Sequence, residues 1–232
     1  MPPSMHDASV ITVQEPLRKE LPYLGGGHGR AVATLYQSLR DHEGPLLLTG
    51  PEGVGKSVIL KVVLAALAIE PIRLINLKNA DKPEWNHRDL ASQILERPIE
   101  TSPDIAVATA IAELTTADER QVVIAVDDAH TLTDKALELL LLIAAPVRAG
   151  RIPPQLILAG RDDILERDLR TELRVIARLA RRVTIEPLTG ADAGDYIAFR
   201  LRRAGTPLVS CRCAAAMTTF LQVRERVFLP MN

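Results

Sequence analysis

The segment GPEGVGKS, residues 50–57, decides how the rest of the chain is interpreted. It matches the pattern G-x-x-x-x-G-K-[ST] at every specified position. It follows the apolar run PLLLTG (45–50), which has the length of a buried strand, and leads into SVILKVVLAALAI (57–69), which suits a buried helix. A glycine-rich turn between a strand and a helix is the context in which this pattern binds phosphate. We therefore predict a phosphate-binding loop at 50–57, called the phosphate loop below.

The residue types of the phosphate loop match the chemistry of a nucleoside triphosphate. Its glycines allow backbone N–H groups to curve around an anion, and the start of the following helix adds partial positive charge. We expect Lys56 to contact the β- and γ-phosphates and Ser57 to bind Mg²⁺. The complete predicted cofactor-binding set is Gly50, Pro51, Glu52, Gly53, Val54, Gly55, Lys56, Ser57 and Val58.

A second apolar run, QVVIAV at 121–126, ends in the carboxylates Asp127 and Asp128. Ligands of parallel α/β sheets bind at the carboxyl ends of the strands. We expect Asp127 to hold Mg²⁺ through its water shell and Asp128 to orient and polarise the attacking water, because phosphoryl transfer depends on positioning and charge neutralisation. A strand that ends in two aspartates is also a common capped turn, and its pairing with the phosphate loop favours the catalytic interpretation.

The order of the remaining segments predicts an α/β fold with a parallel sheet covered by helices on both faces. Five strands are expected, at 45–50, 72–77, 121–126, 155–160 and 183–188. Helices are expected at 30–43, 57–69, 134–147 behind a Thr133 cap, 162–181, 190–204 and 209–223, with two weaker helical patterns in 87–117 broken by Pro98 and Pro103. The pattern becomes all-helical after residue 188, which predicts an α/β domain at 1–188 and a short helical appendage at 189–232.

Composition narrows the class of protein further. Hydrophobic residues make up 47% and charged residues 25%, which excludes a disordered, collagen-like or disulfide-scaffold chain. No apolar run approaches the roughly 20 residues of a membrane span, and the start of the chain does not read as a signal peptide. The two cysteines, Cys211 and Cys213, suit free thiols in a reducing compartment. A cytoplasmic location is therefore expected.

Charge is distributed unevenly along the chain. Residues 1–144 hold 13 basic and 20 acidic side chains, whereas residues 145–232 hold 15 and 9. The later part is thus +6 against −7 for the earlier part. A basic surface of this kind permits DNA binding without demonstrating it.

The succession of motifs resembles a known family. GPEGVGKS (50–57), VVIAVDDAH (122–130), PPQLILAGRDDIL (153–165), LARRVTIEPLT (179–189) and YIAFRLRRAG (196–205) are similar to segments of the AAA+ ATPases of the general secretion pathway A type, a group related to ATP-binding regulators of bacterial transposons. The similarity covers roughly residues 20–205. It implies a five-stranded parallel sheet with a helical lid, ATP bound at a subunit interface and nucleotide-driven oligomers.

The resemblance also suggests roles for two arginines. Arg161 follows the strand at 155–160, where AAA+ proteins place the sensor 1 residue that reads the γ-phosphate; the family usually has a neutral polar residue there. An ion pair with Asp162 or Asp163 is the alternative. Arg182 precedes the fifth strand, where the family carries the arginine finger that completes a neighbour's site. A solvated basic helix end is the alternative for Arg182.

Several features depart from the family or remain open. Asp128 stands where the family usually has glutamate, so the attacking water would be held less closely and hydrolysis would be slow. The lid is short, with Arg224 a weak candidate for sensor 2. His28 lies near the adenine position of AAA+ proteins, and we interpret it as a surface loop residue. The secretion members carry a membrane span and a periplasmic module beyond the ATPase, so their role is not carried over directly.

The sequence as a whole predicts an ATPase that binds and hydrolyses Mg²⁺·ATP between subunits to drive assembly or remodelling of an unidentified protein partner. Two alternatives remain: an ATP-dependent regulator of DNA transposition or targeting, and a nucleotide-binding switch with slow turnover.

Overall fold

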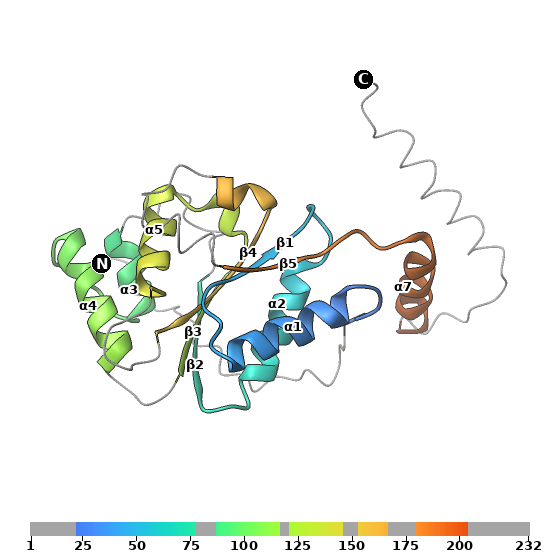
Figure 1. Ribbon diagram of the computed structural model, residues 1–232, viewed down its shortest axis with the longest axis horizontal. Helices are drawn as coiled ribbons and strands as arrows, with labels where there is room; N and C mark the ends of the chain where they lie inside the picture. The colour runs from blue at the N-terminus through green and yellow to red at the C-terminus, as the bar shows by residue number, and fades with distance from the viewer. Residues whose placement is uncertain (1–21, 78–86, 117–120, 146–152, 167–179, 204–232) are drawn as a thin grey trace, which may run out of the picture.

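The computed structural model describes residues 22–77, 87–116, 121–145, 153–166 and 180–203. Its centre is a five-stranded sheet in which every strand is parallel to its neighbours, in the order β2-β3-β4-β1-β5 (Figure 1). The strands are β1 Leu46–Thr49, β2 Ile72–Leu77, β3 Gln121–Val126, β4 Gln155–Gly160 and β5 Arg181–Thr184. The predicted α/β class and the parallel five-stranded sheet are confirmed.

Helices connect the strands, as parallel pairing requires. They are α1 His28–Arg40, α2 Lys56–Leu67, α3 His87–Ile94, α4 Pro103–Thr116, α5 Asp134–Ile143 and α7 Gly190–Arg203, with short 3₁₀-helices η1 Ala129–Thr131 and η2 Asp162–Glu166. Thr133 caps α5 as predicted, because its hydroxyl accepts the Ala136 N–H at 3.2 Å. None of the helices in the described ranges is long and apolar enough to cross a membrane.

Each face of the sheet has its own apolar core, because successive residues of a strand point to opposite sides. Leu46 and Leu48 of β1 pack with α1 and α2 on one face, whereas Leu47 belongs to the cluster formed with α3, α4 and α5 on the other. Figure 1 shows the two groups of helices on opposite sides of the strands. Strands β1 and β4 are buried at every position, so the residues that follow their carboxyl ends extend directly from the packed centre of the sheet.

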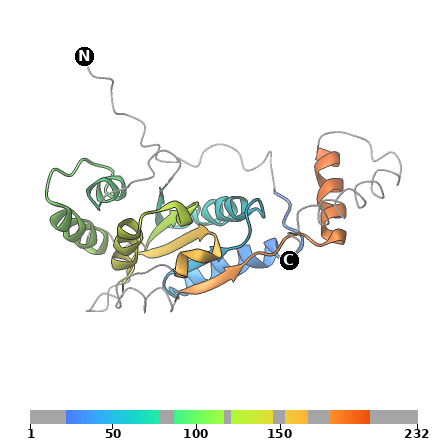
Figure 2. The ribbon, with the colours of Figure 1, turned by 90° about the horizontal axis from the view of Figure 1, so that it is seen from above.

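Helix α7 lies apart from this core. None of its residues is buried, and Figure 2 shows it at one end of the molecule, away from the sheet. Tyr23 holds it: the Tyr23 ring lies 5.5 Å from the ring of Tyr196 and 5.7 Å from that of Phe199, centroid to centroid. The helix expected at 209–223 and Arg224 lie outside the described residues, so the division at residue 188 stays a prediction.

The predicted bounds of the fifth strand were wrong, and the helical segment predicted before it is described only in part. The strand expected at 183–188 runs over Arg181–Thr184, because β1 is only four residues long and offers pairing partners only to that stretch. Ile185 adds one further hydrogen bond, from its N–H to the carbonyl of Thr49 at 2.8 Å. The segment expected as a helix at 162–181 starts with the 3₁₀-helix η2, and residues 167–179 lie outside the described part.

Candidate functional site

The phosphate loop joins β1 to α2, as the sequence predicts. Its three glycines have positive φ angles, +149° at Gly50, +76° at Gly53 and +101° at Gly55. Gly55 is the N-cap of α2, in the left-handed conformation that glycine adopts without strain. At Gly50 a Cβ would lie only 2.4 Å from the carbonyl oxygen of Ile185, so the end of β5 presses directly against the start of the loop.

The loop presents a set of free backbone donors. Within the part of the chain that the structure describes, the N–H groups of Gly53, Gly55, Lys56 and Ser57 donate no hydrogen bond. Two of them belong to the first turn of α2, where the helix has no internal acceptors and carries partial positive charge. A bound anion such as a phosphate group would satisfy these donors together.

Lys56 lies inside this loop. Its Nζ donates to the carbonyl oxygens of Gly50, at 2.9 Å, and Pro51, at 2.7 Å, and the residue is only 8% exposed. Among the described residues no carboxylate forms an ion pair with it. Burying a charge without an opposite charge is costly. The arrangement therefore favours an anionic ligand beside Lys56.

The carboxylates Asp127 and Asp128 lie at the same edge of the sheet as the phosphate loop. In the strand register both Val126 and Leu47 are level with Leu158 of β4, so the ends of β3 and β1 flank β4 at similar heights. Two strand spacings amount to about 10 Å, so the two motifs lie about that far apart along the sheet edge. The structure thus brings together the two motifs that the sequence analysis pairs.

Asp128 has an unusual backbone conformation. Its φ is +51° and ψ +38°, and its N–H donates to the Asp127 carboxylate at 3.1 Å. The left-handed region is tolerated by aspartate and asparagine better than by other residues with a Cβ. This gives a local physical reason for the shorter acid at the position where the family usually has glutamate.

Arg161 follows β4, between the strands that end in the phosphate loop and in Asp127. Its guanidinium Nη2 lies 3.2 Å from Oδ2 of Asp163, and both side chains are about half exposed. Of the two alternatives left open by the sequence, the ion pair is therefore formed in the structure. An exposed pair of this kind contributes only about 0–1 kcal/mol, so it presents little barrier to a different contact.

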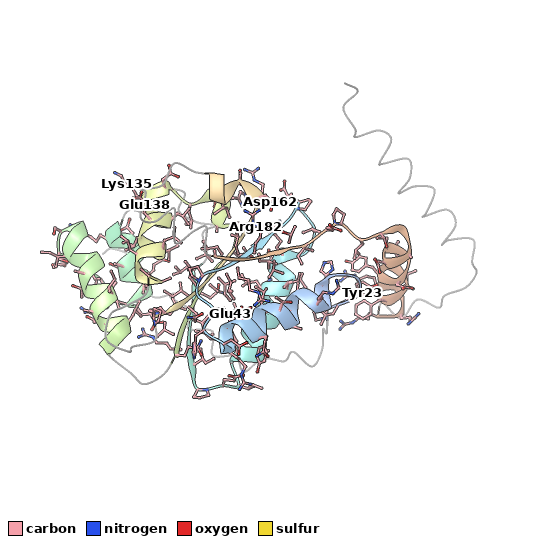
Figure 3. All side chains as sticks on the ribbon, in the orientation of Figure 1. Tyr23, Glu43, Lys135, Glu138, Asp162 and Arg182 are labelled. Atoms are coloured by element: carbon pink, nitrogen blue, oxygen red, sulfur yellow. The ribbon has the colours of Figure 1, made fainter. Side chains whose placement is uncertain are left out.

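Arg181 and Arg182 stand at the opposite end of their strand from the phosphate loop. Arg182 is level with Leu47, three residues before Gly50, and its exposed side chain makes no hydrogen bond or ion pair within the described residues. Arg181 forms an ion pair with Glu43, whose side chain lies near the far end of α1 from Tyr23 (Figure 3). The Ser38 hydroxyl and then Arg181 lower the pKa of the Glu43 carboxyl. Within the described residues Arg182 thus has no side-chain partner, whereas Arg181 would first have to leave its ion pair with Glu43.

His28 is not a surface residue, and that interpretation was wrong. It is only 7% exposed, and its Nε2 lies 2.8 Å from the carbonyl oxygen of Val54 in the phosphate loop. The contact spans 26 residues of sequence, so no local pattern in GGGHG could reveal it. The only available signal was the position of His28 directly ahead of the first helix.

The close approach at Gly50 leads to a stability prediction. Gly50→Ala should lower the free energy of unfolding by about 2–4 kcal/mol, because the new Cβ meets a backbone carbonyl and is held at positive φ. Gly53→Ala is the matched control, since φ is also positive there but nothing lies within 4 Å of the added atom, and about 1 kcal/mol is expected. Urea denaturation of the two variants measures the difference; equal losses would contradict the contact with Ile185.

Comparison with known proteins agrees with this geometry. Residues 39–167 match the AAA domain family, so the chain belongs to that family. Its fold and phosphate loop define it as an AAA+ P-loop protein. Over 193 residues it is 30% identical to the general secretion pathway protein A of Aeromonas hydrophila, a match that covers 79% of this chain and 34% of that protein. The chain thus spans about a third of that relative's length.

Solved structures share the fold. Cdc6p from Pyrobaculum aerophilum matches with a TM-score of 0.64 at 20% identity, over 79% of this chain and 50% of that chain. The Aeropyrum pernix ORC1 protein in complex with DNA gives 0.61 at 19% identity, over 85% and 55%. Drosophila ORC bound to DNA gives 0.57 at 18% identity, over 87% and 55%. At such identities the similarity concerns the fold alone, and the chain spans about half of each.

Proposed function

We propose that this protein binds and hydrolyses Mg²⁺·ATP at the phosphate loop and that a neighbouring subunit completes the site. The observation that carries the proposal is Lys56, a buried cation that among the described residues is bonded only to neutral carbonyl oxygens and lies beside four N–H groups without an acceptor. A polyphosphate supplies what both features need, namely negative charge and several acceptor oxygens.

The residues present also fit a magnesium ion carried by the nucleotide. Ser57 and Asp127 would hold it, and the ion would neutralise charge on the transferred phosphoryl group. In the described ranges no three histidine, cysteine or acidic side chains cluster closely enough to hold a metal ion. This agrees with Mg²⁺, which keeps waters and substrate phosphates among its ligands and needs only one or two protein groups.

Asp128 would position the attacking water. Its carboxylate is exposed at the carboxyl edge of the sheet, and its backbone is held by the N–H bond to the Asp127 side chain. We expect Asp128→Asn to keep the left-handed backbone and the fold, to leave the dissociation constant for Mg²⁺·ATP within about twofold, and to lower kcat by at least about 100-fold. Steady-state phosphate release and equilibrium ATP titration measure the two quantities.

Asp41→Asn is the control for this test, because Asp41 is the C-cap residue of α1 and is exposed, far from the carboxyl edge of the sheet. It should change neither quantity. Turnover by Asp128→Asn at the unmodified rate would contradict the role of Asp128 in catalysis. Intact ATP binding with negligible turnover in the unmodified protein would instead favour the nucleotide-binding switch. The short side chain of Asp128 supports that alternative.

The work done with ATP is inferred from the relatives. We infer that nucleotide-dependent assembly remodels a protein partner, as the similarity to general secretion pathway protein A suggests. A DNA-targeting role is the second candidate. Arg200, Arg202 and Arg203 lie in the last turn of α7, and their charges suit phosphate contacts.

A further inference from the structure

We propose that His28 is a positioning residue for the phosphate loop: it holds the Val54–Gly55 peptide in the orientation that turns the Gly55 N–H toward bound phosphate. The inference rests on the proposed nucleotide site and adds to it a residue outside the loop. It starts from one contact, the 2.8 Å approach of His28 Nε2 to the carbonyl oxygen of Val54.

This contact determines the tautomer of the imidazole. A carbonyl oxygen can only accept a hydrogen bond, so Nε2 must carry the proton and donate it. In the neutral ring Nδ1 is then an acceptor without a proton. His28 Nδ1 is buried and has no hydrogen-bond partner among the described residues. Within the described ranges the ring therefore makes one polar contact, and that contact is with the phosphate loop.

The direction of the bond determines the direction of the neighbouring N–H. In a trans peptide the C=O and the following N–H point to opposite sides of the chain. The structure contains no cis peptide bonds in its described ranges. Because His28 draws the Val54 carbonyl toward the start of α1, the Gly55 N–H must point away from α1. It is one of the four loop N–H groups without an acceptor.

The His28 ring lies close against the phosphate loop, and hydrogen bonds of the preceding turn hold the His28 backbone. A Cβ on Gly55 would lie 3.0 Å from His28 Nε2, so the ring contacts the loop along the peptide that it bonds. The turn before α1 is closed by the His28 N–H to the Gly25 carbonyl at 3.3 Å and by the Gly29 N–H to the Leu24 carbonyl at 3.2 Å. His28 therefore links α1 to the phosphate loop across 26 residues of sequence.

Packing alone does not explain a histidine here. A buried acceptor without a partner lowers stability, and an aliphatic side chain of similar size would remove that cost. The imidazole is explained by what its Nε2–H does to the loop. A positioning role thus predicts that phosphate binding and stability respond differently to substitution, whereas a packing role predicts that they change together.

Two variants test this. His28→Leu fills the space without a donor, and His28→Gln restores a donor near the position of Nε2. Loss of one hydrogen bond is expected to weaken binding of Mg²⁺·ATP and of inorganic triphosphate by the same factor, about tenfold, in His28→Leu. His28→Gln should remain within about threefold of the unmodified protein. The thermal midpoints of the two ligand-free variants should be no lower than that of the unmodified protein by more than about 3 °C.

Three results would overturn the proposal. Unchanged binding in His28→Leu would show that the bond does not matter to the loop. An equal loss in His28→Gln would show that the donor is not the cause. Weaker ATP binding with unchanged triphosphate binding would place His28 at the base of the nucleotide and not at the phosphate loop.

A measurement on the ligand-free protein separates this inference from the proposed function. Nitrogen-15 spectra of the imidazole should show a protonated Nε2 and an unprotonated Nδ1, and the Gly55 amide resonance should move in His28→Leu but much less in His28→Gln. If the unmodified protein binds no nucleotide, the proposed function fails, but these spectra still show whether His28 Nε2–H is bonded to the Val54 carbonyl. A protonated Nδ1 with bare Nε2, or a Gly55 resonance unmoved in His28→Leu, refutes the positioning role.

Discussion

Replacing Lys56 with alanine is expected to weaken Mg²⁺·ATP binding by about 100-fold, because the variant loses the one buried cation of the phosphate loop and its charge-assisted hydrogen bonds to phosphate. Hydrolysis should fall below detection. Lys61→Ala is the matched control: Lys61 lies on the same helix, is exposed, and should be replaceable without effect. Isothermal titration with ATP measures the affinity of each variant.

The same substitution should have little effect on the stability of the ligand-free protein. Removal of Lys56 relieves the cost of a buried charge with no carboxylate beside it in the described residues, but it also takes a donor from the carbonyl oxygens of Gly50 and Pro51. The two effects oppose each other, so the free energy of unfolding should change by less than about 1 kcal/mol. Urea denaturation checks this. ATP affinity of Lys56→Ala close to that of the unmodified protein would remove the basis of the nucleotide-site assignment.

Replacing Arg182 with alanine is expected to lower kcat by about 1000-fold with little change in ATP affinity, the behaviour of an arginine finger supplied in trans. The prediction rests on the proposed shared site: Arg182 is exposed and is level with Leu47, three residues before the start of its own phosphate loop. Arg181→Ala is the control, because it breaks only the exposed ion pair with Glu43 and should cost about 0–1 kcal/mol of stability.

Mixing two inactive variants makes this prediction sharper. Lys56→Ala keeps Arg182 but binds no ATP, whereas Arg182→Ala binds ATP but lacks the finger. If the site is shared between subunits, a mixture of the two should recover part of the activity that neither has alone. Failure to recover activity in mixed oligomers, or a strong effect of Arg182→Ala on ATP affinity, would argue against a finger supplied in trans.

The sequence predicted the sheet well because its strands are nearly continuous apolar runs. β1, β3 and β4 are buried at almost every position, and such runs can be recognised without knowledge of their neighbours. The phosphate loop was also easy to recognise, since two glycines, a lysine and a serine at specified spacing are what a phosphate-binding loop requires. The Thr133 cap of α5 was readable for the same reason, namely that it depends on residues only three positions apart.

The errors arose where distant residues decide the outcome. The bounds of β5 follow from pairing with the short β1, which lies more than 130 residues earlier. The burial of His28 follows from the folding of α1 onto α2, and its contact with Val54 joins segments that share no motif. Arg161 is a different case, because its partner Asp163 is only two residues away and was one of the partners that the sequence offered; the sequence could not decide between that ion pair and a ligand contact.

The left-handed conformation of Asp128 also escaped prediction, although its consequence is chemical. The sequence shows only that an aspartate replaces the usual glutamate. The structure adds that the backbone at Asp128 has φ +51°. A glutamate there would extend further toward the substrate, but its backbone would be strained in this left-handed conformation. The presence of aspartate at position 128 is therefore explained by the left-handed backbone of the turn that it occupies.

The most direct test of the central claim is Mg²⁺-dependent ATP hydrolysis, measured as rate per subunit over a range of protein concentrations, with Lys56→Ala as the blank and with duplex DNA added in a parallel series. A site completed by a neighbour predicts a rate per subunit that rises with concentration and vanishes in Lys56→Ala; stimulation by DNA would select the DNA-targeting candidate. A rate that survives in Lys56→Ala, or no ATP binding and no turnover at any concentration, would contradict the assignment of this protein as an ATPase.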